Sequence, residues 1–194
     1  MKIGVLALQG AFIEHEKMLQ RLGVEAIEVR LPRHLDDVAG VIIPGGESTT
    51  IGKLAVQYNL IGPLRELAQA GKPLWGTCAG LILMAKDVGR DQPRLGLLDV
   101  TVQRNAFGRQ VDSFEATLNI KDLGDKPFHA IFIRAPLIEA VGGGVDVLAR
   151  VEKGDRDVIV AARQGNLLGT SFHPELSADD RFHRYFLKMT ESKT

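Results

Sequence analysis

The chain has 194 residues, of which 45% are hydrophobic and 25% charged, and its 24 basic and 24 acidic side chains cancel to a formal charge of zero. This length and composition are typical of a globular protein, and we expect residues 1–194 to form one domain. The zero net charge, without any basic block, excludes electrostatic support for a nucleic-acid partner. No apolar run approaches the ~20 residues of a membrane helix, and a single cysteine excludes an intrachain disulfide framework. We therefore expect a cytoplasmic protein.

The first half of the sequence alternates between predicted strands and predicted helices. Its first apolar run, residues 2–8, breaks at Gln9 and Gly10, which favours a buried strand over a secretory signal. Such alternation indicates βαβ units, and hence a parallel sheet with helices on both faces. The other predicted strands of this half are residues 25–30, 40–43 and 73–76, and the predicted helices are residues 13–22, 49–58, 63–70 and 81–84.

The second half has short predicted strands separated by Gly, Asp and Asn turns, and it ends in a predicted helix at residues 178–189. This pattern indicates an antiparallel or mixed extension of the sheet. The fold class expected for the whole chain is α/β, with a central, mostly parallel sheet. The predicted strands of this half are residues 99–103, 115–120, 130–133, 145–151, 158–163 and 167–172.

The only cysteine lies in the segment Gly76-Thr77-Cys78-Ala79-Gly80, where a predicted strand meets a predicted helix. The G-x-C-x-G pattern is the cysteine version of a nucleophile elbow, a sharp turn that small flanking residues permit. Such a turn exposes the sulfur at the carboxyl end of the sheet and at a helix N-terminus, where the thiolate is favoured. The alternative is a buried structural cysteine.

A second motif is His173-Pro174-Glu175. Residues i and i+2 of an extended segment project to the same side, and Pro174 biases His173 towards extended geometry. The carboxylate is then within reach of the imidazole, as in a triad whose acid orients its base. The alternative is a satisfied histidine in a turn.

The segment Gly45-Gly46-Glu47-Ser48 follows the predicted strand at residues 40–43. A phosphate-binding loop is excluded, because five residues separate Gly46 from Gly52 where that motif needs four. A Gly-Gly turn lets backbone N–H groups approach a substrate closely. The N–H groups of Gly46 and Ala79 are therefore candidates for an oxyanion hole; the alternative is a simple turn that ends the strand.

Taken together, these segments resemble the class I, triad-type glutamine amidotransferases and, within them, the glutaminase subunits of pyridoxal 5′-phosphate synthase. The elbow and the His-Pro-Glu motif mark the superfamily, whereas other segments point to this branch. Ile82 stands where many amidotransferases have Gln, as it does in this branch. The similar segments are residues 3–10, 44–50, 75–80, 104–110, 132–136 and 171–175.

The resemblance implies a flavodoxin-like fold and the hydrolysis of L-glutamine to L-glutamate and ammonia through a thioester on Cys78, with His173 and Glu175 completing the triad. We expect no cofactor, and we expect no metal because no set of His, Cys, Asp and Glu residues has metal-ligand spacing. The resemblance also implies a (β/α)8-barrel synthase subunit as partner, in a complex with twelve copies of each subunit. The residues expected to seat glutamine are Gly46, Glu47, Ser48, Arg104, Ile133 and Arg134.

Other functions stay open at this point. The chain could be the glutaminase of a different amidotransferase complex, a cysteine redox or stress protein on the same fold, or a silent binding subunit. The remaining histidines, His15, His34, His129 and His183, are expected to be structural or surface residues.

Overall fold

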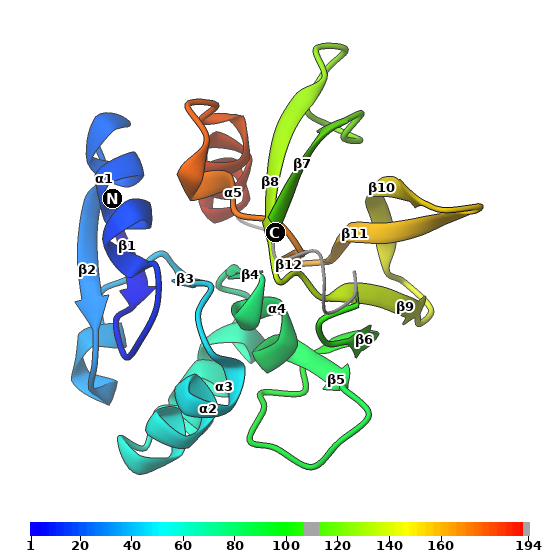
Figure 1. Cartoon of the computed structure of the whole chain (residues 1–194). Helices are drawn as coiled ribbons and strands as arrows, with labels where there is room; N and C mark the ends of the chain where they lie inside the picture. The colour runs from blue at the N-terminus through cyan, green and yellow to red at the C-terminus, as the bar shows by residue number, and fades with distance from the viewer. Residues whose placement is uncertain (107–112, 192–194) are drawn as a thin grey trace.

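The computed structural model describes residues 1–106 and 113–191, so residues 107–110 of the resembling segment 104–110 lie outside the described part. Its centre is a twisted sheet with helices on both faces (Figure 1). Five neighbouring strands run parallel in the order β2-β1-β3-β4-β12, which is the flavodoxin-like order. They are β1 (Lys2–Leu6), β2 (Glu25–Val29), β3 (Gly40–Ile43), β4 (Leu74–Thr77) and β12 (Leu167–Thr170).

The strand β12 comes from the last part of the chain and lies beside β4, with Thr170 opposite Thr77. Beyond β12 the sheet changes to antiparallel pairing, so the predicted mixed extension is confirmed. A separate hairpin pairs β7 with β8. The strands of this half are β5 (Ala85–Asp87), β6 (Leu98–Gln103), β7 (Ser113–Leu118), β8 (Phe128–Ile133), β9 (Leu137–Val141), β10 (Asp146–Lys153) and β11 (Arg156–Gln164).

The strand β9 has no counterpart among the predicted elements. Its sequence, Leu-Ile-Glu-Ala-Val, mixes good helix formers with good strand formers, so local propensity does not decide its structure. Pairing with β6 on one side and β11 on the other decides it, and both pairings are long-range.

The helices divide between the two faces of the sheet (Figure 1). On one face, α1 and α5 pack through Leu19, Phe182 and Phe186. On the other, α2, α3 and α4 pack through Ile51, Leu64 and other apolar side chains. None of the helices in the described ranges is long and apolar enough to cross a membrane. The helices are α1 (Phe12–Arg21), α2 (Ser48–Gln57), α3 (Ile61–Gln69), α4 (Ala79–Met84) and α5 (Arg181–Glu191), with short 3-10 turns η1 (Pro32–Leu35) and η2 (Pro174–Leu176).

Candidate active site

A cavity of about 500 Å³ opens at the carboxyl ends of the parallel strands. In open α/β sheets, ligands bind at this edge, next to the point where the strand order reverses. The order reverses here between β1 and β3. Four segments that follow β1, β3, β4 and β12 line the cavity, and they contribute Gln9–Ala11, Gly45–Ser48, Cys78–Ala79 and His173 respectively.

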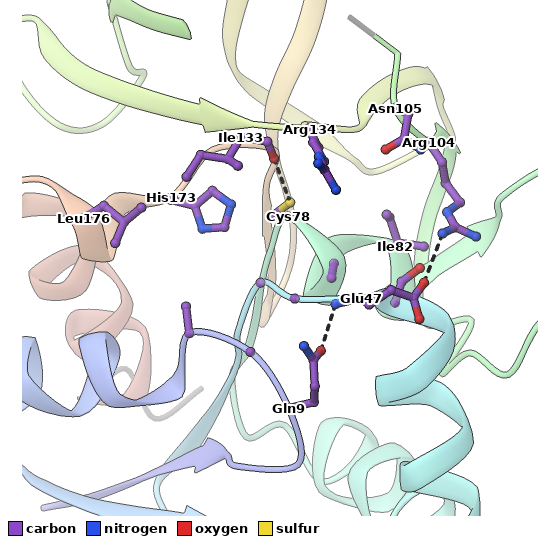
Figure 2. A pocket seen from close by; sticks show the side chains of 16 residues that line it. Gln9, Glu47, Cys78, Ile82, Arg104, Asn105, Ile133, Arg134, His173 and Leu176 are labelled. Carbon is purple, nitrogen blue, oxygen red and sulfur yellow. Dashed lines mark hydrogen bonds and ion pairs between the residues drawn. The ribbon is translucent and has the colours of Figure 1, made fainter. Parts of the chain in front are cut away.

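Cys78 occupies the turn between β4 and α4 with φ 49° and ψ −102°, a backbone conformation that non-glycine residues rarely adopt. The strand–turn–helix geometry predicted from G-x-C-x-G is therefore present. The Cys78 N–H donates to Thr170 O at 2.8 Å, which ties the turn to β12. The sulfur is in contact with the cavity, 3.8 Å from Ile133 O, although the residue is only 7% exposed (Figure 2).

His173 and Glu175 lie just beyond β12, where His173 N–H donates to Ile131 O at 2.8 Å. The imidazole Nδ1 lies 2.6 Å from Glu175 Oε1, and both side chains are buried. The predicted reach of carboxylate to imidazole is confirmed, but by a different backbone. Pro174 begins the 3-10 turn η2, so a tight turn rather than an extended segment brings the two side chains together.

The electrostatics of this pair favour a charged imidazole. Burial by itself would lower the pKa of His173, but hydrogen bonds with the side chains of Cys78 and Glu175, and their charges, raise it to about 10. Burial would likewise raise the pKa of Glu175, yet the neighbouring His15 and His173 lower it. Because Nδ1 is engaged with Glu175, the Cys78 sulfur is left to Nε2. An imidazolium thus stands between a carboxylate and the only thiol of the chain.

The Gly45-Gly46 turn lies against this pair without any side chain in the way. A Cβ atom on Gly45 would overlap the His173 imidazole and lie 3.4 Å from Cys78 Cβ. The N–H of Ala11 donates to Gly45 O at 2.9 Å, so the planar trans peptide directs the Gly46 N–H away from Ala11. Gly46 and Ala79 both line the cavity, as expected for the two oxyanion-hole candidates.

Glu47 supports the cavity wall through its side chain. The carboxylate caps α2 by accepting from the N–H groups of Thr49 and Thr50. Burial would raise the pKa of Glu47, but the hydrogen bonds from Thr50 and Thr49 lower it to about 2. The N–H of Glu47 donates to Gln9 Oε1 at 2.8 Å (Figure 2). The charge of Glu47 is thus committed to the α2 cap and to a cation nearby.

That cation is Arg104. Its NH2 lies 3.3 Å from Glu47 Oε1 (Figure 2). Its NH1 donates to Gln92 Oε1 at 2.9 Å. The guanidinium is therefore held over the start of α2 at the edge of the cavity. Ser48 also lines the cavity, with its Oγ 3.5 Å from Gln92 Nε2.

Ile133 and Arg134 form the opposite wall, where β8 ends. Arg134 has φ 44°, and Asn105 beside Arg104 has φ 47°. With Cys78, three of the five non-glycine residues that have positive φ in the described ranges line this one cavity. Strained backbone gathers at functional sites because the surrounding structure must hold a geometry that function requires.

The sequence motifs missed several residues that line the cavity. Gln9, Gly10 and Ala11 follow β1, so the rule that ligands bind at carboxyl ends of strands was the signal that could have identified them. Asn105 and Leu176 were missed as well. His15, expected to be structural or on the surface, is fully buried within 3.4 Å of Glu175 Oε2. Within residues 1–106 and 113–191, no group of three His, Cys, Asp or Glu side chains is arranged to hold a metal ion.

Comparison with known proteins places these features in a family. The model of the SNO glutamine amidotransferase family matches residues 5–192. A protein of Moorella thermoacetica named pyridoxal 5′-phosphate synthase subunit PdxT is 60% identical over 190 residues, which cover 97% of this chain and 99% of that protein. The protein of the same name from Herpetosiphon aurantiacus is 60% identical over 191 residues, covering 96% and 99% respectively.

A solved structure described as a glutamine amidotransferase has the same fold. It superposes with a TM-score of 0.91 at 52% sequence identity, over 98% of this chain and 99% of the other.

Proposed function

This chain belongs to the SNO glutamine amidotransferase family, and on that premise we propose that it is the glutaminase subunit of a pyridoxal 5′-phosphate synthase. Its reaction is the hydrolysis of L-glutamine to L-glutamate and ammonia. The observation that carries this proposal is the line of side chains Cys78, His173 and Glu175, in which Cys78 and His173 come from two loops to line one cavity and Glu175 lies buried behind His173.

In the proposed first step, the Cys78 sulfur attacks the side-chain amide carbon of glutamine. The carbonyl oxygen becomes an oxyanion, and the N–H groups of Gly46 and Ala79 stabilise it. The imidazolium of His173 gives its Nε2 proton to the departing nitrogen, and the C–N bond breaks to release ammonia. A γ-glutamyl thioester on Cys78 is left.

In the second step, water replaces ammonia. The now neutral His173 takes a proton from water as its oxygen attacks the thioester carbon, and the C–S bond breaks to release glutamate. Glu175 holds Nδ1 throughout, so the ring keeps the orientation and tautomer that both steps need. The reaction consumes one water for each glutamine.

Arg104, Ile133, Arg134 and the Gly46–Ser48 backbone are proposed to seat the amino acid part of glutamine. A guanidinium suits recognition of a carboxylate. The Arg104 guanidinium is already positioned for this role, because Gln92 and Glu47 hold its side chain at the cavity edge. Ile133 contributes through the last backbone groups of β8, and Arg134 through the strained backbone that follows it.

A partner subunit is part of the proposal, since ammonia released into water would become protonated and lose its nucleophilicity. The relatives are named as subunits of pyridoxal 5′-phosphate synthase, and we infer that a (β/α)8-barrel synthase subunit covers the cavity, with twelve copies of each. Exposed apolar side chains support a covered rim: Ile133 is 39% exposed and Leu176 41%, and both line the cavity. We also propose that residues 1–194 act as one domain, and that it works in the cytoplasm, where a catalytic thiol stays reduced.

The test is glutamate release from glutamine by the purified chain, with and without the matching synthase subunit. We expect turnover that the synthase subunit increases and that Cys78→Ala abolishes. Turnover that is indifferent to the synthase subunit would keep the glutaminase and reject this partner. Absence of turnover under both conditions would reject the glutaminase and favour a redox role for Cys78.

A further inference from the structure

The two carboxylate oxygens of Glu175 have different surroundings. Oε1 meets His173 Nδ1 at 2.6 Å. Oε2 is buried and accepts no hydrogen bond of full geometry within the described residues. His15 Nε2 lies 3.4 Å from Oε2, and neither side chain is exposed to solvent. A buried carboxylate oxygen without a hydrogen-bond donor costs folding free energy. The imidazole of His15 is the polar group beside Oε2, so it has an electrostatic effect on Glu175.

His15 belongs to α1, the helix that follows the cavity segment Gln9–Ala11. Its ring is held on three sides. Nδ1 lies 2.9 Å from Nε2 of His183 in α5, Nε2 lies 3.3 Å from Thr77 Oγ1, and the ring makes a T-shaped contact with Trp75 at a centroid distance of 5.6 Å. This buried ring therefore links α1 and α5 to the residue that precedes Cys78.

Burial lowers the pKa of His15, against the opposing charge of Glu175, and lowers that of His183 well below its ordinary value, which favours the neutral imidazole in both rings. A neutral imidazole has one N–H and one acceptor nitrogen. If the proton of His15 were on Nδ1, the lone pair of Nε2 would face the carboxylate. The negative charge of Glu175 therefore selects the tautomer with the proton on Nε2.

That choice determines the rest of the chain of contacts. His15 Nδ1 becomes the acceptor, so His183 Nε2 must donate to it across their 2.9 Å separation. His183 Nδ1 is then a bare acceptor, and it is a buried atom that has no hydrogen-bond partner among the described residues. The unpaired group at the end of the chain is thus a lone pair and not an N–H.

We propose that His15 is a positioning residue for the glutaminase reaction. Its Nε2–H faces Oε2 of Glu175 and thereby keeps Oε1 directed at His173. This inference rests on the proposed function. The N–H, shared with Thr77 Oγ1, limits rotation of the carboxylate about its own axis. A carboxylate free to rotate would leave the His173 ring without a fixed tautomer, and the proton would reach the departing nitrogen less often.

The first experiment compares His15→Leu with His15→Gln in the complex with the synthase subunit, measured as glutamate release. Losing a partner that orients a metal-ligating side chain typically costs 10–100-fold in activity, and we apply the same range to the group beside Glu175. We expect kcat to fall by about 10–100-fold in His15→Leu, with KM within about twofold of the wild type. His15→Gln keeps an N–H donor at a similar reach, and we expect it to recover most of the loss. Unchanged kcat in His15→Leu, or no recovery in His15→Gln, would overturn the proposal.

The pH profile separates positioning from simple packing. Besides His15, the titratable groups that influence this cluster are His173 and Cys78, Glu14 in α1, His183 in α5, and Arg21. Without the His15 N–H, the carboxylate of Glu175 is easier to protonate, so the acid limb of kcat/KM moves to higher pH in His15→Leu.

Leu64→Ala removes a fully buried side chain from the core on the other face of the sheet and serves as the control for lost stability. We expect it to keep the wild-type acid limb; an unmoved limb in His15→Leu would contradict the proposal.

The tautomer is measured without any turnover, by two-bond proton–nitrogen correlation NMR of the full chain. A proton on Nε2 of His15 supports the inference, and a proton on Nδ1 overturns it. Wild-type protein that shows the Nε2–H tautomer but hydrolyses no glutamine would reject the proposed function instead, so the two failures are distinguishable.

Discussion

Gly76 and Gly80, the two glycines of the elbow, contact each other across Cys78. A Cβ atom on Gly76 would lie 2.5 Å from Gly80 O and 2.7 Å from Leu81 N. A Cβ atom on Gly80 would lie 2.8 Å from the carbonyl carbon of Ile43, and closer still to its oxygen. The turn that carries Cys78 is therefore packed backbone against backbone: a side chain at Gly76 would push α4 away from β4, and one at Gly80 would push α4 away from β3.

Gly80→Ala tests this packing. Overpacking a well-filled site typically costs about 1–3 kcal/mol, and contact with rigid backbone places this change at or above the upper end. We expect a lower midpoint of urea unfolding and loss of most glutamine turnover. Gly143→Ala, in the turn between β9 and β10, is the matched control, because a Cβ there meets nothing within 4 Å and the residue has no left-handed φ. Equal midpoints for the two variants would show that the elbow tolerates a side chain.

Glu175→Gln removes the charge that orients His173 while preserving the shape of the side chain. An amide offers its NH2 as readily as its oxygen, so the tautomer of His173 is no longer set by the 2.6 Å contact with Oε1. By comparison with triads in which the acid is replaced by its amide, we expect kcat to fall by about 10³–10⁴-fold. The measurement is steady-state glutamate release, with circular dichroism to check folding. A folded variant with kcat near that of the wild type would remove Glu175 from the mechanism.

The pH dependence of stability should follow His173. Its pKa is about 10 in the folded protein, above the ordinary value of 6.5. Because the folded state holds this proton more tightly than the unfolded state, the stabilisation is complete below about pH 6.5 and is lost as pH rises towards 10.

We measure this as the difference in urea midpoint between the wild type and His173→Gln, at intervals from pH 6 to pH 10. The difference should shrink steadily with rising pH. A difference that stays constant over this range would mean that His173 is neutral in the folded protein.

Arg104→Met tests the seating of glutamine. Hydrogen bonds to charged groups contribute about 1.5–3 kcal/mol, which corresponds to roughly 10–100-fold in affinity. We expect KM for glutamine to rise by that factor with little change in kcat, since Arg104 lies at the cavity edge, away from the Cys78 sulfur (Figure 2). Arg33→Met changes an exposed arginine outside the cavity and should leave KM unchanged. A drop in kcat alone would give Arg104 a part in the chemistry and not in binding.

Several local features were predictable from the sequence for physical reasons. The first strand and the elbow glycines were evident because burial on both faces demands a continuous apolar run, and a sharp turn demands small residues. The His173–Glu175 contact was evident because it spans only two residues, although a 3-10 turn makes it and not an extended strand.

Long-range relationships were decided only in the tertiary structure. Neither the insertion of β12 beside β4 nor the approach of His15 to Glu175 leaves a local trace, because backbone hydrogen bonds are alike for any strand pair and a buried histidine looks the same in many cores. Residue types and their spacing were enough to make Cys78, His173 and Glu175 candidates for the chemistry of a glutaminase. The packing of the sheet decided which of them meet, because apolar burial against both faces selects the strand order, and that order brings His173 to Cys78.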